Sequence, residues 1–320
     1  MDMLKQLSLA GLVPVIKVKK AEDAVPLCRA LKNGGLPVAE ITFRTDAAEE
    51  AIRLVHEELP EVLLGAGTVL TTDQADRAWN AGAGYIVSPG LNPEVVKHCI
   101  AKGYPVLPGC ANPSDVEVAL SLGLKTVKFF PSEALGGLKL IKAMAAPYGS
   151  LTFVPTGGIS EKNLNDYLAF PKIAACGGSW MVPDDAVEAK DWDRIEKLAR
   201  EAVNLMLGFS IVHVGVNNQD AETAMKEAEK LSRFMGMPIN RDSEKGVFVG
   251  SQFELMKTWF RGTHGHLAIG TKNVDRAKWH LEQRGFTFDE ETATYTPDGR
   301  MKFIYAKEEI GGFGIHLLLV

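Results

Sequence analysis

A lysine stands in the middle of an apolar stretch, "TVKFFPSE" at residues 126–133. The neighbouring Val127 and Phe129 favour a short buried strand, and a lysine is rarely buried unless its surroundings accept the ammonium group. Burial disfavours the ammonium form, and the neutral amine can attack a ketone to form a Schiff base, whose protonated imine is an electron sink. Lys128 therefore predicts imine chemistry, with a snorkelling or ion-paired lysine at a strand end as the alternative.

Other polar side chains stand where neighbouring β-like runs end. Glu40, Thr42 and Arg44 alternate along "EITFR", so they face one side of a strand. Glu40 is the carboxylate that can move protons, and Arg44 can bind a substrate carboxylate through two hydrogen bonds, with Thr68 assisting. Two more residues at strand ends complete the set, Pro89 and Thr156. Together with Lys128 they predict a site for a 2-keto acid.

Two glycine-rich turns follow the last two predicted strands, "TGGIS" at 156–160 and "CGGSW" at 176–180. Glycine lets backbone N–H groups approach an anion closely, and loops in this position of a barrel frequently bind phosphate. A single glycine pair is equally typical of an ordinary turn. Because two pairs occur on consecutive loops, one of them with Ser179, they predict a phosphate site.

These residues need a fold that brings strand ends together. Residues 1–207 alternate between short apolar runs and helix-like segments such as "DAAEEAIRLVHEEL". Such alternation predicts an α/β fold, a closed (β/α)8 TIM-type barrel whose strands all end on one functional face. An open doubly wound parallel sheet is the alternative. The predicted strands are residues 12–18, 38–43, 62–69, 85–89, 105–110, 126–131, 152–158 and 173–179.

Composition and charge limit the classes of protein to which the chain can belong. With 320 residues, 46% hydrophobic and 23% charged, it fits one large domain and one smaller one. A formal net charge of -5 argues against a nucleic-acid-binding surface. The start "MDMLKQLSLAGLVPVIKVKK" lacks the layout of a signal peptide, and no apolar run has membrane-spanning length, so no membrane partner is expected. Four scattered cysteines predict free thiols in a reducing cytoplasm.

Several segments of residues 1–207, taken together, resemble one enzyme family. "EITFRT", "GAGTVL", "SPG", "KFFPSEALGG", "PTGGIS" and "GGSW" are similar, in this order, to segments of the class I aldolases for 2-keto-3-deoxy-6-phosphogluconate and 4-hydroxy-2-oxoglutarate. The resemblance implies cleavage of the first substrate to pyruvate and glyceraldehyde 3-phosphate, and of the second to pyruvate and glyoxylate. One segment departs from the family pattern: "GCANPSD" (109–115) replaces a turn rich in small hydroxyl residues, which bears on substrate preference.

The resemblance also implies a role for each site residue. It places the Schiff-base lysine at Lys128 and the proton-transferring carboxylate at Glu40. It places pyruvate binding at Arg44 and Thr68, with Pro89 lining the site. The remaining substrate contacts fall on Thr156 and, for the phosphate, on Gly157, Gly158 and Ser179. A homotrimer that needs no cofactor for the aldolase reaction is implied as well.

The pattern changes at Gly208. "HVGVNN" (213–218) is echoed by "HLAIGT" (266–271), a helix-like segment follows each, and each copy closes on a similar run, "FELM" (253–256) and "IHLL" (315–318). Residues 208–320 therefore predict a smaller α+β domain of paired βαβββ modules. This arrangement resembles the glyoxalase/bleomycin-resistance (vicinal oxygen chelate) fold.

That resemblance implies a divalent metal site on the first and last strands of each module. The residues at these positions are His213, Glu254, His266 and His316. Three imidazoles and a carboxylate suit Zn²⁺ or a similar first-row ion. His316 stands where the family more often has a carboxylate.

Two alternatives remain open at this point. Residues 1–207 also fit a phosphate-binding barrel isomerase, in which Lys128 acts electrostatically or as an acid/base without forming an imine. Residues 208–320 also fit a non-catalytic module that binds a ligand or mediates assembly.

Overall fold

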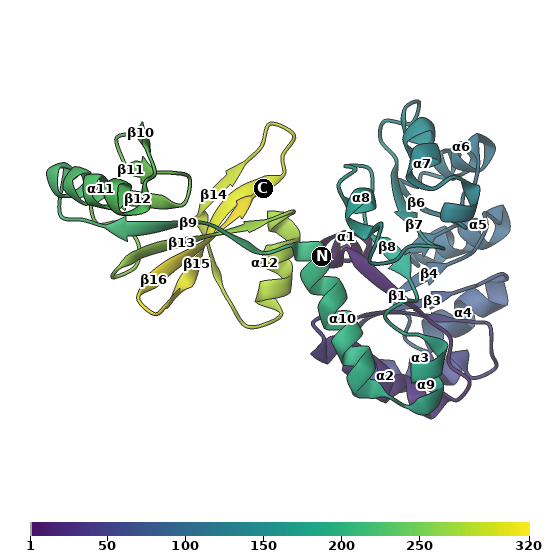
Figure 1. The fold of residues 1–320 in the computed structure, drawn as a ribbon. Helices are drawn as coiled ribbons and strands as arrows, with labels where there is room; N and C mark the ends of the chain where they lie inside the picture. The colour runs from purple at the N-terminus through teal and green to yellow at the C-terminus, as the bar shows by residue number, and fades with distance from the viewer. Residues whose placement is uncertain (1) are drawn as a thin grey trace. The chain divides into compact units, whose positions relative to one another are not determined.

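The computed structural model describes residues 2–320, which form two compact units (Figure 1). The first unit ends at Met206 and the second begins at Leu207, one residue before the boundary expected from the sequence. Within the described part of the chain, no helix combines the length and the apolar character needed to cross a membrane.

The first unit alternates strands and helices along the chain. Its strands are β1 (Leu12–Ile16), β2 (Val38–Thr42), β3 (Leu63–Gly67), β4 (Tyr85–Val87), β5 (Val106–Leu107), β6 (Thr126–Phe129), β7 (Thr152–Pro155) and β8 (Cys176–Gly178). Its α-helices are α1 (Met3–Ala10), α2 (Ala24–Asn33), α3 (Ala48–Glu58), α4 (Thr72–Asn80), α5 (Pro93–Lys102), α6 (Pro113–Ser121), α7 (Gly137–Ala145), α8 (Leu164–Leu168), α9 (Asp184–Ala189) and α10 (Trp192–Leu207). Short 3₁₀ turns occupy Ala21–Asp23 and Glu133–Leu135.

All strands of the first unit pair in parallel, in two sheets. Six strands follow the order β5-β4-β3-β2-β1-β8, and β6 pairs with β7. Single parallel bridges join the two sheets at both ends, Gly109 with Lys128 and Thr156 with Gly177. The first unit is thus an α/β domain with a curled parallel sheet. Its ladder is regular from β5 to β8 and reduced to single bridges on either side of the β6–β7 pair.

Prolines account for strands that are shorter than the sequence predicts. The run 105–110 yields only the two residues of β5, because Pro105 and Pro108 flank them and carry no N–H group for a ladder. Lys128 nevertheless anchors this edge: its N–H donates to the Pro108 carbonyl at 2.9 Å, and its carbonyl accepts from Cys110 at 2.8 Å. The backbone of the lysine is therefore fixed on the β5 side.

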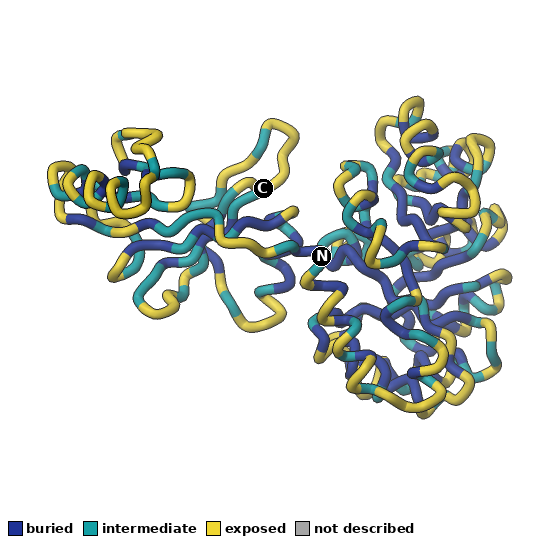
Figure 2. The backbone as a smooth tube through the Cα atoms, in the orientation of Figure 1, coloured by how far each residue is buried: buried dark blue, intermediate teal, exposed yellow. Residues whose placement is uncertain are grey.

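The core of the first unit lies along its strands. In Figure 2 these strands run dark blue through the interior, while the outward faces of the helices and the loops are yellow. The pattern follows from sequence, since every residue of β2 and β4 is buried and α3 buries only Ala48, Ala51, Ile52 and Val55. Strands covered on both faces are typical of a parallel sheet.

The second unit repeats one arrangement of a strand, a helix and three strands. The first copy is β9 (Ser210–Asn217), α11 (Ala221–Met235), β10 (Ile239–Asp242), β11 (Gly246–Val249) and β12 (Phe253–Met256). The second copy is β13 (Gly265–Thr271), α12 (Val274–Glu282), β14 (Phe288–Tyr295), β15 (Met301–Ile310) and β16 (Phe313–Leu319). The βαβββ order of the described chain is the order that the sequence predicts.

The two copies share one eight-stranded sheet, in the order β10-β11-β12-β9-β13-β16-β15-β14. In each copy the first and last strands are parallel neighbours, and the copies meet where β9 pairs antiparallel with β13. The sheet is therefore symmetric about its centre, and the four central strands are the ones that carry the predicted metal ligands. In the first copy, α11 packs Ala224 and Ala228 against a small core of Val247, Val249 and Leu255.

Candidate functional site

A buried ion pair forms the centre of the first unit. Lys128 of β6 and Glu40 of β2 are 5% and 3% exposed, and Nζ lies 3.2 Å from Oε1. The sequence analysis left an ion-paired lysine open as the alternative, and the structure supplies a carboxylate partner for the ammonium group. Gly67 makes room for that partner, since a Cβ at this position would lie 2.3 Å from Glu40 Oε1. The pair brings a potential nucleophile and a potential acid/base into direct contact.

A cavity of about 460 Å³ opens onto this lysine. Its size falls in the range of small-molecule sites. Most of the wall consists of residues at or just beyond the carboxyl ends of the strands. Among them are the predicted residues Arg44, Thr68, Pro89, Lys128, Thr156, Gly157, Gly158 and Ser179. Glu40 does not line the cavity and reaches it through its contact with Lys128.

Arg44 and Thr68 lie together on one wall. The Arg44 Nε donates to Thr68 Oγ1 at 3.5 Å, so the contact is long. Thr68 has φ 58, a left-handed backbone conformation that is uncommon for a residue with a branched side chain. Such a conformation persists where the surroundings hold it, and here it aims the hydroxyl at the guanidinium. The two side chains can bind a planar carboxylate beside the lysine.

The first glycine turn exposes backbone to the same cavity. Gly157 and Gly158 have φ 96 and 81, and a Cβ at Gly158 would lie 2.6 Å from the Glu133 side chain. Only glycine fits this position without displacing the loop after β6. Ser179 follows β8 on the adjacent wall. Backbone N–H groups and a hydroxyl in this arrangement suit a phosphate.

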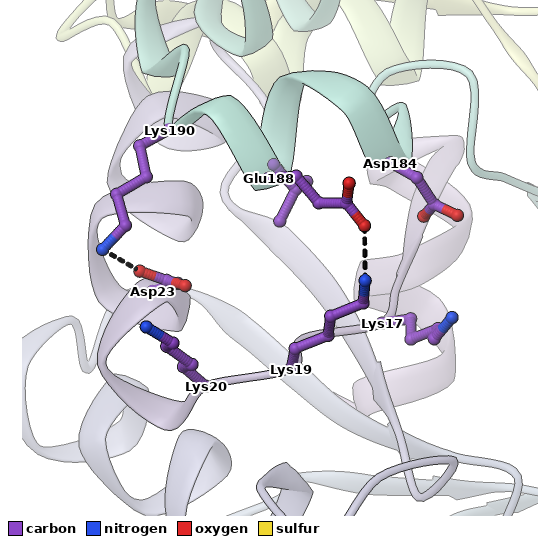
Figure 3. A pocket seen from close by; sticks show the side chains of 8 residues that line it. Lys17, Lys19, Lys20, Asp23, Asp184, Glu188 and Lys190 are labelled. Atoms are coloured by element: carbon purple, nitrogen blue, oxygen red, sulfur yellow. Dashed lines mark hydrogen bonds and ion pairs between the residues drawn. The ribbon is translucent and has the colours of Figure 1, made fainter.

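Lys17 and Asp184 are cavity residues that the sequence analysis missed. Both line the large cavity and also a neighbouring one of about 160 Å³. Figure 3 shows the neighbouring cavity, where Lys19 pairs with Glu188 at 2.5 Å and Lys190 with Asp23 at 2.7 Å. Glu188 raises the pKa of Lys19 through a hydrogen bond and its charge. These pairs occupy Lys19 and Lys190.

Lys17, in contrast, has no ion-pair partner within residues 2–320, and neither has Asp184. Lys17 immediately follows β1, so the argument that selected residues at the other strand ends also selects it. The sequence analysis included it in the predicted strand of residues 12–18 and gave it no role. Its unpaired ammonium group adds positive charge to the cavity that holds the glycine turn.

The second unit brings all four predicted ligands together. His213 and His266 face each other with 3.0 Å between their Nε2 atoms, and Glu254 Oε2 lies 3.5 and 3.3 Å from these two atoms. The ligand atoms of His213, His266 and His316 all lie within 4.8 Å of one another. A Cβ at Gly215 would lie 2.1 Å from the His266 ring, so a glycine on β9 makes space for this imidazole.

Burial favours the neutral form of two of these imidazoles, His213 and His316, by lowering their pKa values. It lowers the pKa of His316 to about 3, with further lowering from His266 and His213. Burial, followed by the charge of His266, lowers the pKa of His213 as well, against a smaller effect of Glu254. The buried Nδ1 atoms of His266 and His316 have no hydrogen-bond partner within the described chain. Neutral imidazoles around a carboxylate are the donor set that a divalent ion such as Zn²⁺ requires.

The fold and the first site define a parallel α/β enzyme built around a buried lysine–carboxylate pair with a phosphate-type glycine turn. The family model "KDPG and KHG aldolase" matches residues 3–198, more than half of the 320 residues. The chain belongs to this aldolase family.

Characterised relatives cover the same part of the chain. The 2-dehydro-3-deoxy-phosphogluconate aldolase of Treponema pallidum is 47% identical over 204 residues, which are 64% of this chain and 97% of that protein. The KHG/KDPG aldolase of Escherichia coli K12 is 48% identical over 197 residues, 62% of this chain and 92% of that protein.

Solved structures of aldolases match a similar share of the chain. The KDPG aldolase of Legionella pneumophila, with pyruvate captured as a covalent carbinolamine intermediate, matches with a TM-score of 0.61 at 37% identity. That match covers 63% of this chain and 98% of the other. The 2-keto-3-deoxy-6-phosphogluconate aldolase of Zymomonas mobilis ZM4 with 3-phosphoglycerate matches with a TM-score of 0.60 at 43% identity, over 63% and 94% of the two chains.

Proposed function

We propose that the first unit is a class I aldolase that cleaves 2-keto-3-deoxy-6-phosphogluconate to pyruvate and glyceraldehyde 3-phosphate through a Schiff base on Lys128. The observation that carries this proposal is the contact of Lys128 with Glu40 at the wall of a cavity of substrate size. The family membership and the covalent pyruvate adduct of the Legionella relative support it.

The cavity suggests how the substrate is held. Arg44 and Thr68 bind the carboxylate next to the ketone, and Pro89 and Thr156 line the space between. The glycine turn of Gly157 and Gly158, with Ser179, binds the distal phosphate through N–H and O–H groups. The ammonium group of Lys17 lines the same cavity and adds positive charge toward this dianion. Both ends of the substrate are thus fixed relative to Lys128.

The reaction then follows from the lysine–carboxylate pair. Lys128 first releases its ammonium proton to solvent, and the neutral amine adds to the C2 ketone. The carbinolamine hydroxyl then takes up a proton and leaves as water, which gives a protonated imine. Glu40 accepts the proton of the C4 hydroxyl as the C3–C4 bond breaks, and the electron pair of that bond moves into the imine to give an enamine. Glyceraldehyde 3-phosphate leaves as the aldehyde. Glu40 returns its proton to C3, and water hydrolyses the pyruvate imine to free the lysine.

The same steps cleave 4-hydroxy-2-oxoglutarate to pyruvate and glyoxylate, which we propose as a second activity. The Escherichia coli relative is a KHG/KDPG aldolase. The first test is trapping with pyruvate and borohydride, because an imine is reduced to a stable amine. A phosphate-binding isomerase that uses Lys128 only as a charge or an acid/base gives no covalent product.

Three wider features belong to this proposal. We propose a closed (β/α)8 barrel, supported by the two single bridges that flank β6 and β7. We also propose a homotrimer, for which the exposed apolar side chains Leu70, Ile100 and Val118 are candidate interface residues, and sedimentation measures the assembly state. The cytoplasmic location stays a prediction.

For the second unit we propose a metal-binding domain of the glyoxalase/vicinal-oxygen-chelate type. The cluster of His213, Glu254, His266 and His316 supports it, together with the symmetric pair of βαβββ modules. A divalent ion held there supplies a Lewis acid, and the four side chains keep it in place between the central strands. Elemental analysis of the purified chain tests the site, and an absence of metal after growth in zinc- and nickel-supplemented medium leaves a binding or assembly module.

A further inference from the structure

A buried tyrosine ties together the two loops that border the proposed phosphate subsite. Tyr167 of α8 is 1% exposed, and its hydroxyl contacts Ser132 Oγ at 2.9 Å and the carboxylate of Glu133. Ser132 and Glu133 lie four and five residues beyond Lys128, in the loop after β6. Tyr167 itself lies on the helix that follows the glycine turn. The hydroxyl thus links the loop of the lysine strand to the segment of the phosphate turn.

The backbone joins the same two segments. The Ser132 N–H donates to the Thr156 carbonyl at 2.8 Å, and the Glu133 N–H donates to the Gly157 carbonyl at 3.0 Å. At Gly137 a Cβ would lie 2.6 Å from Glu133 Oε1 and 2.8 Å from the Tyr167 hydroxyl. A glycine is therefore required where this side-chain contact is made, which indicates a built arrangement rather than an incidental surface contact.

The direction of the hydrogen bonds follows from the donors available. A carboxylate accepts only, so Tyr167 donates its one proton to Glu133 and accepts from the Ser132 hydroxyl. Burial and, after it, the hydrogen bond to Glu133 raise the pKa of Tyr167 to about 12, so the phenol keeps its proton at neutral pH. The chain from Ser132 through Tyr167 to Glu133 is fully satisfied.

Glu133 is a negative charge beside a site proposed for a dianion. Its Cβ and Cγ lie 2.6 Å from the position of a Cβ on Gly158, a residue that lines the substrate cavity. Like charges in this proximity repel a phosphate unless the carboxylate is held away and hydrogen-bonded. The Tyr167 hydroxyl donates a hydrogen bond to this carboxylate and holds it away from the phosphate subsite.

We propose that Tyr167 is a positioning residue that holds Glu133 away from the phosphate subsite and thereby gives the aldolase its preference for phosphorylated substrates. The inference rests on the proposed aldolase function. Tyr167 and Glu133 are expected to affect binding of the distal end of the substrate. They are not expected to affect imine formation, because neither contacts Lys128.

The test compares the full-length wild type with Tyr167→Phe, Glu133→Gln and the double variant. Two substrates with the same carbon skeleton are used, 2-keto-3-deoxy-6-phosphogluconate and the unphosphorylated 2-keto-3-deoxygluconate. Tyr167→Phe is expected to raise KM for the phosphorylated substrate about 5- to 30-fold relative to the unphosphorylated one, with little change in kcat. In the double variant, Glu133→Gln removes the negative charge that Tyr167→Phe leaves free to move. The KM for the phosphorylated substrate should therefore return most of the way to the wild-type value.

Tyr148→Phe is the matched control. Tyr148 donates to Glu117 at 3.0 Å on the outer surface of the same unit, so it loses the same kind of hydrogen bond away from the cavity. Tyr148→Phe should leave the ratio of the KM values for the two substrates unchanged. Titration of inorganic phosphate by calorimetry gives a readout that does not depend on turnover: binding should weaken in Tyr167→Phe and recover in the double variant.

The outcomes separate the two claims. A wild type that traps pyruvate on Lys128, combined with equal losses on both substrates and no rescue by Glu133→Gln, overturns the role of Tyr167 and leaves the aldolase intact. Unchanged phosphate binding in Tyr167→Phe, or no phosphate binding by the wild type, overturns it as well. Failure of the wild type to trap pyruvate contradicts the aldolase function instead, while the phosphate titration still decides on Tyr167.

Discussion

In the first unit a buried ammonium group faces a buried carboxylate, whereas in the second unit three imidazoles lie together and a carboxylate contacts two of them. Lys128 and Glu40 compensate each other at 3.2 Å, so their site is complete with the side chains of this chain. After burial, the neighbouring imidazoles lower the pKa of His316 and of His213, and two buried imidazole nitrogens have no hydrogen-bond partner within residues 2–320. From this difference we propose that the first site carries covalent chemistry of its own and that the second is a receptor for a cation.

The largest effect is expected where the first site loses its acid/base. Glu40→Gln keeps the shape that Gly67 accommodates but removes the proton acceptor, so turnover should fall by about 10²–10⁴-fold. The imine should still form, because Lys128 remains. Steady-state cleavage and borohydride trapping measure the two steps separately. A rate near that of the wild type would show that another group carries the proton.

In the second site the corresponding change is His213→Ala. This variant removes the imidazole that contacts both His266 and Glu254, so divalent-metal affinity should fall by at least about 100-fold. Metal titration and elemental analysis provide the measurement. His98→Ala, which alters a histidine paired with Asp76 on the first unit, is the control and should keep the metal.

Treatment of the full-length protein with a chelator tests whether the first unit works without metal in the second. Removal of the metal should not slow aldol cleavage, because the imine supplies the electron sink. Cleavage that stops on chelation and returns with added metal would contradict the division between the two sites.

The smallest effect concerns the stability of the metal-free second unit against pH. Burial and the neighbouring imidazoles lower the pKa of His316 from 6.5 to about 3, so between these values the unfolded chain binds a proton that the folded chain does not. Stability is therefore full above about pH 6.5 and decreases as pH falls toward 3, by at most about 1.4 kcal/mol per pH unit.

Thermal unfolding of the chelated protein measures this slope. The midpoint of the second unit should fall by a few degrees per pH unit below 6.5. The slope should decrease in His316→Gln, which cannot take up the proton. A midpoint that is constant between pH 6.5 and pH 4 would contradict neutral burial of this imidazole.

Local patterns in the sequence were enough for the elements and for the residues that end strands. Lys128, Glu40 and the glycine turn were found because parallel strands bring their carboxyl ends to one face. The echo of "HVGVNN" in "HLAIGT" likewise predicted which histidines share the central strands. Strand lengths were less predictable, since Pro105 and Pro108 reduced one run to the two residues of β5.

Long-range contacts could not be predicted from these patterns. The sequence placed Lys128 and Glu40 in one predicted site but did not predict their direct contact, which joins residues 88 positions apart. Tyr167 and Glu133 are 34 residues apart, and their contact depends on how α8 packs against the loop after β6. Lys17 was predictable in principle, but charge alone does not show which of Lys17, Lys19 and Lys20 lines the substrate cavity.

Reductive trapping of pyruvate tests the central claim most directly. The full-length protein is incubated with pyruvate and borohydride, digested, and mapped by mass spectrometry, next to Lys128→Met and to Lys20→Met as a control lysine outside the substrate cavity. We predict one reduced pyruvate adduct, on Lys128 in the peptide that contains "TVKFFPSE", present in the wild type and in Lys20→Met and absent in Lys128→Met. An adduct on another lysine, or no adduct from a protein that still cleaves 2-keto-3-deoxy-6-phosphogluconate, would contradict imine chemistry at Lys128.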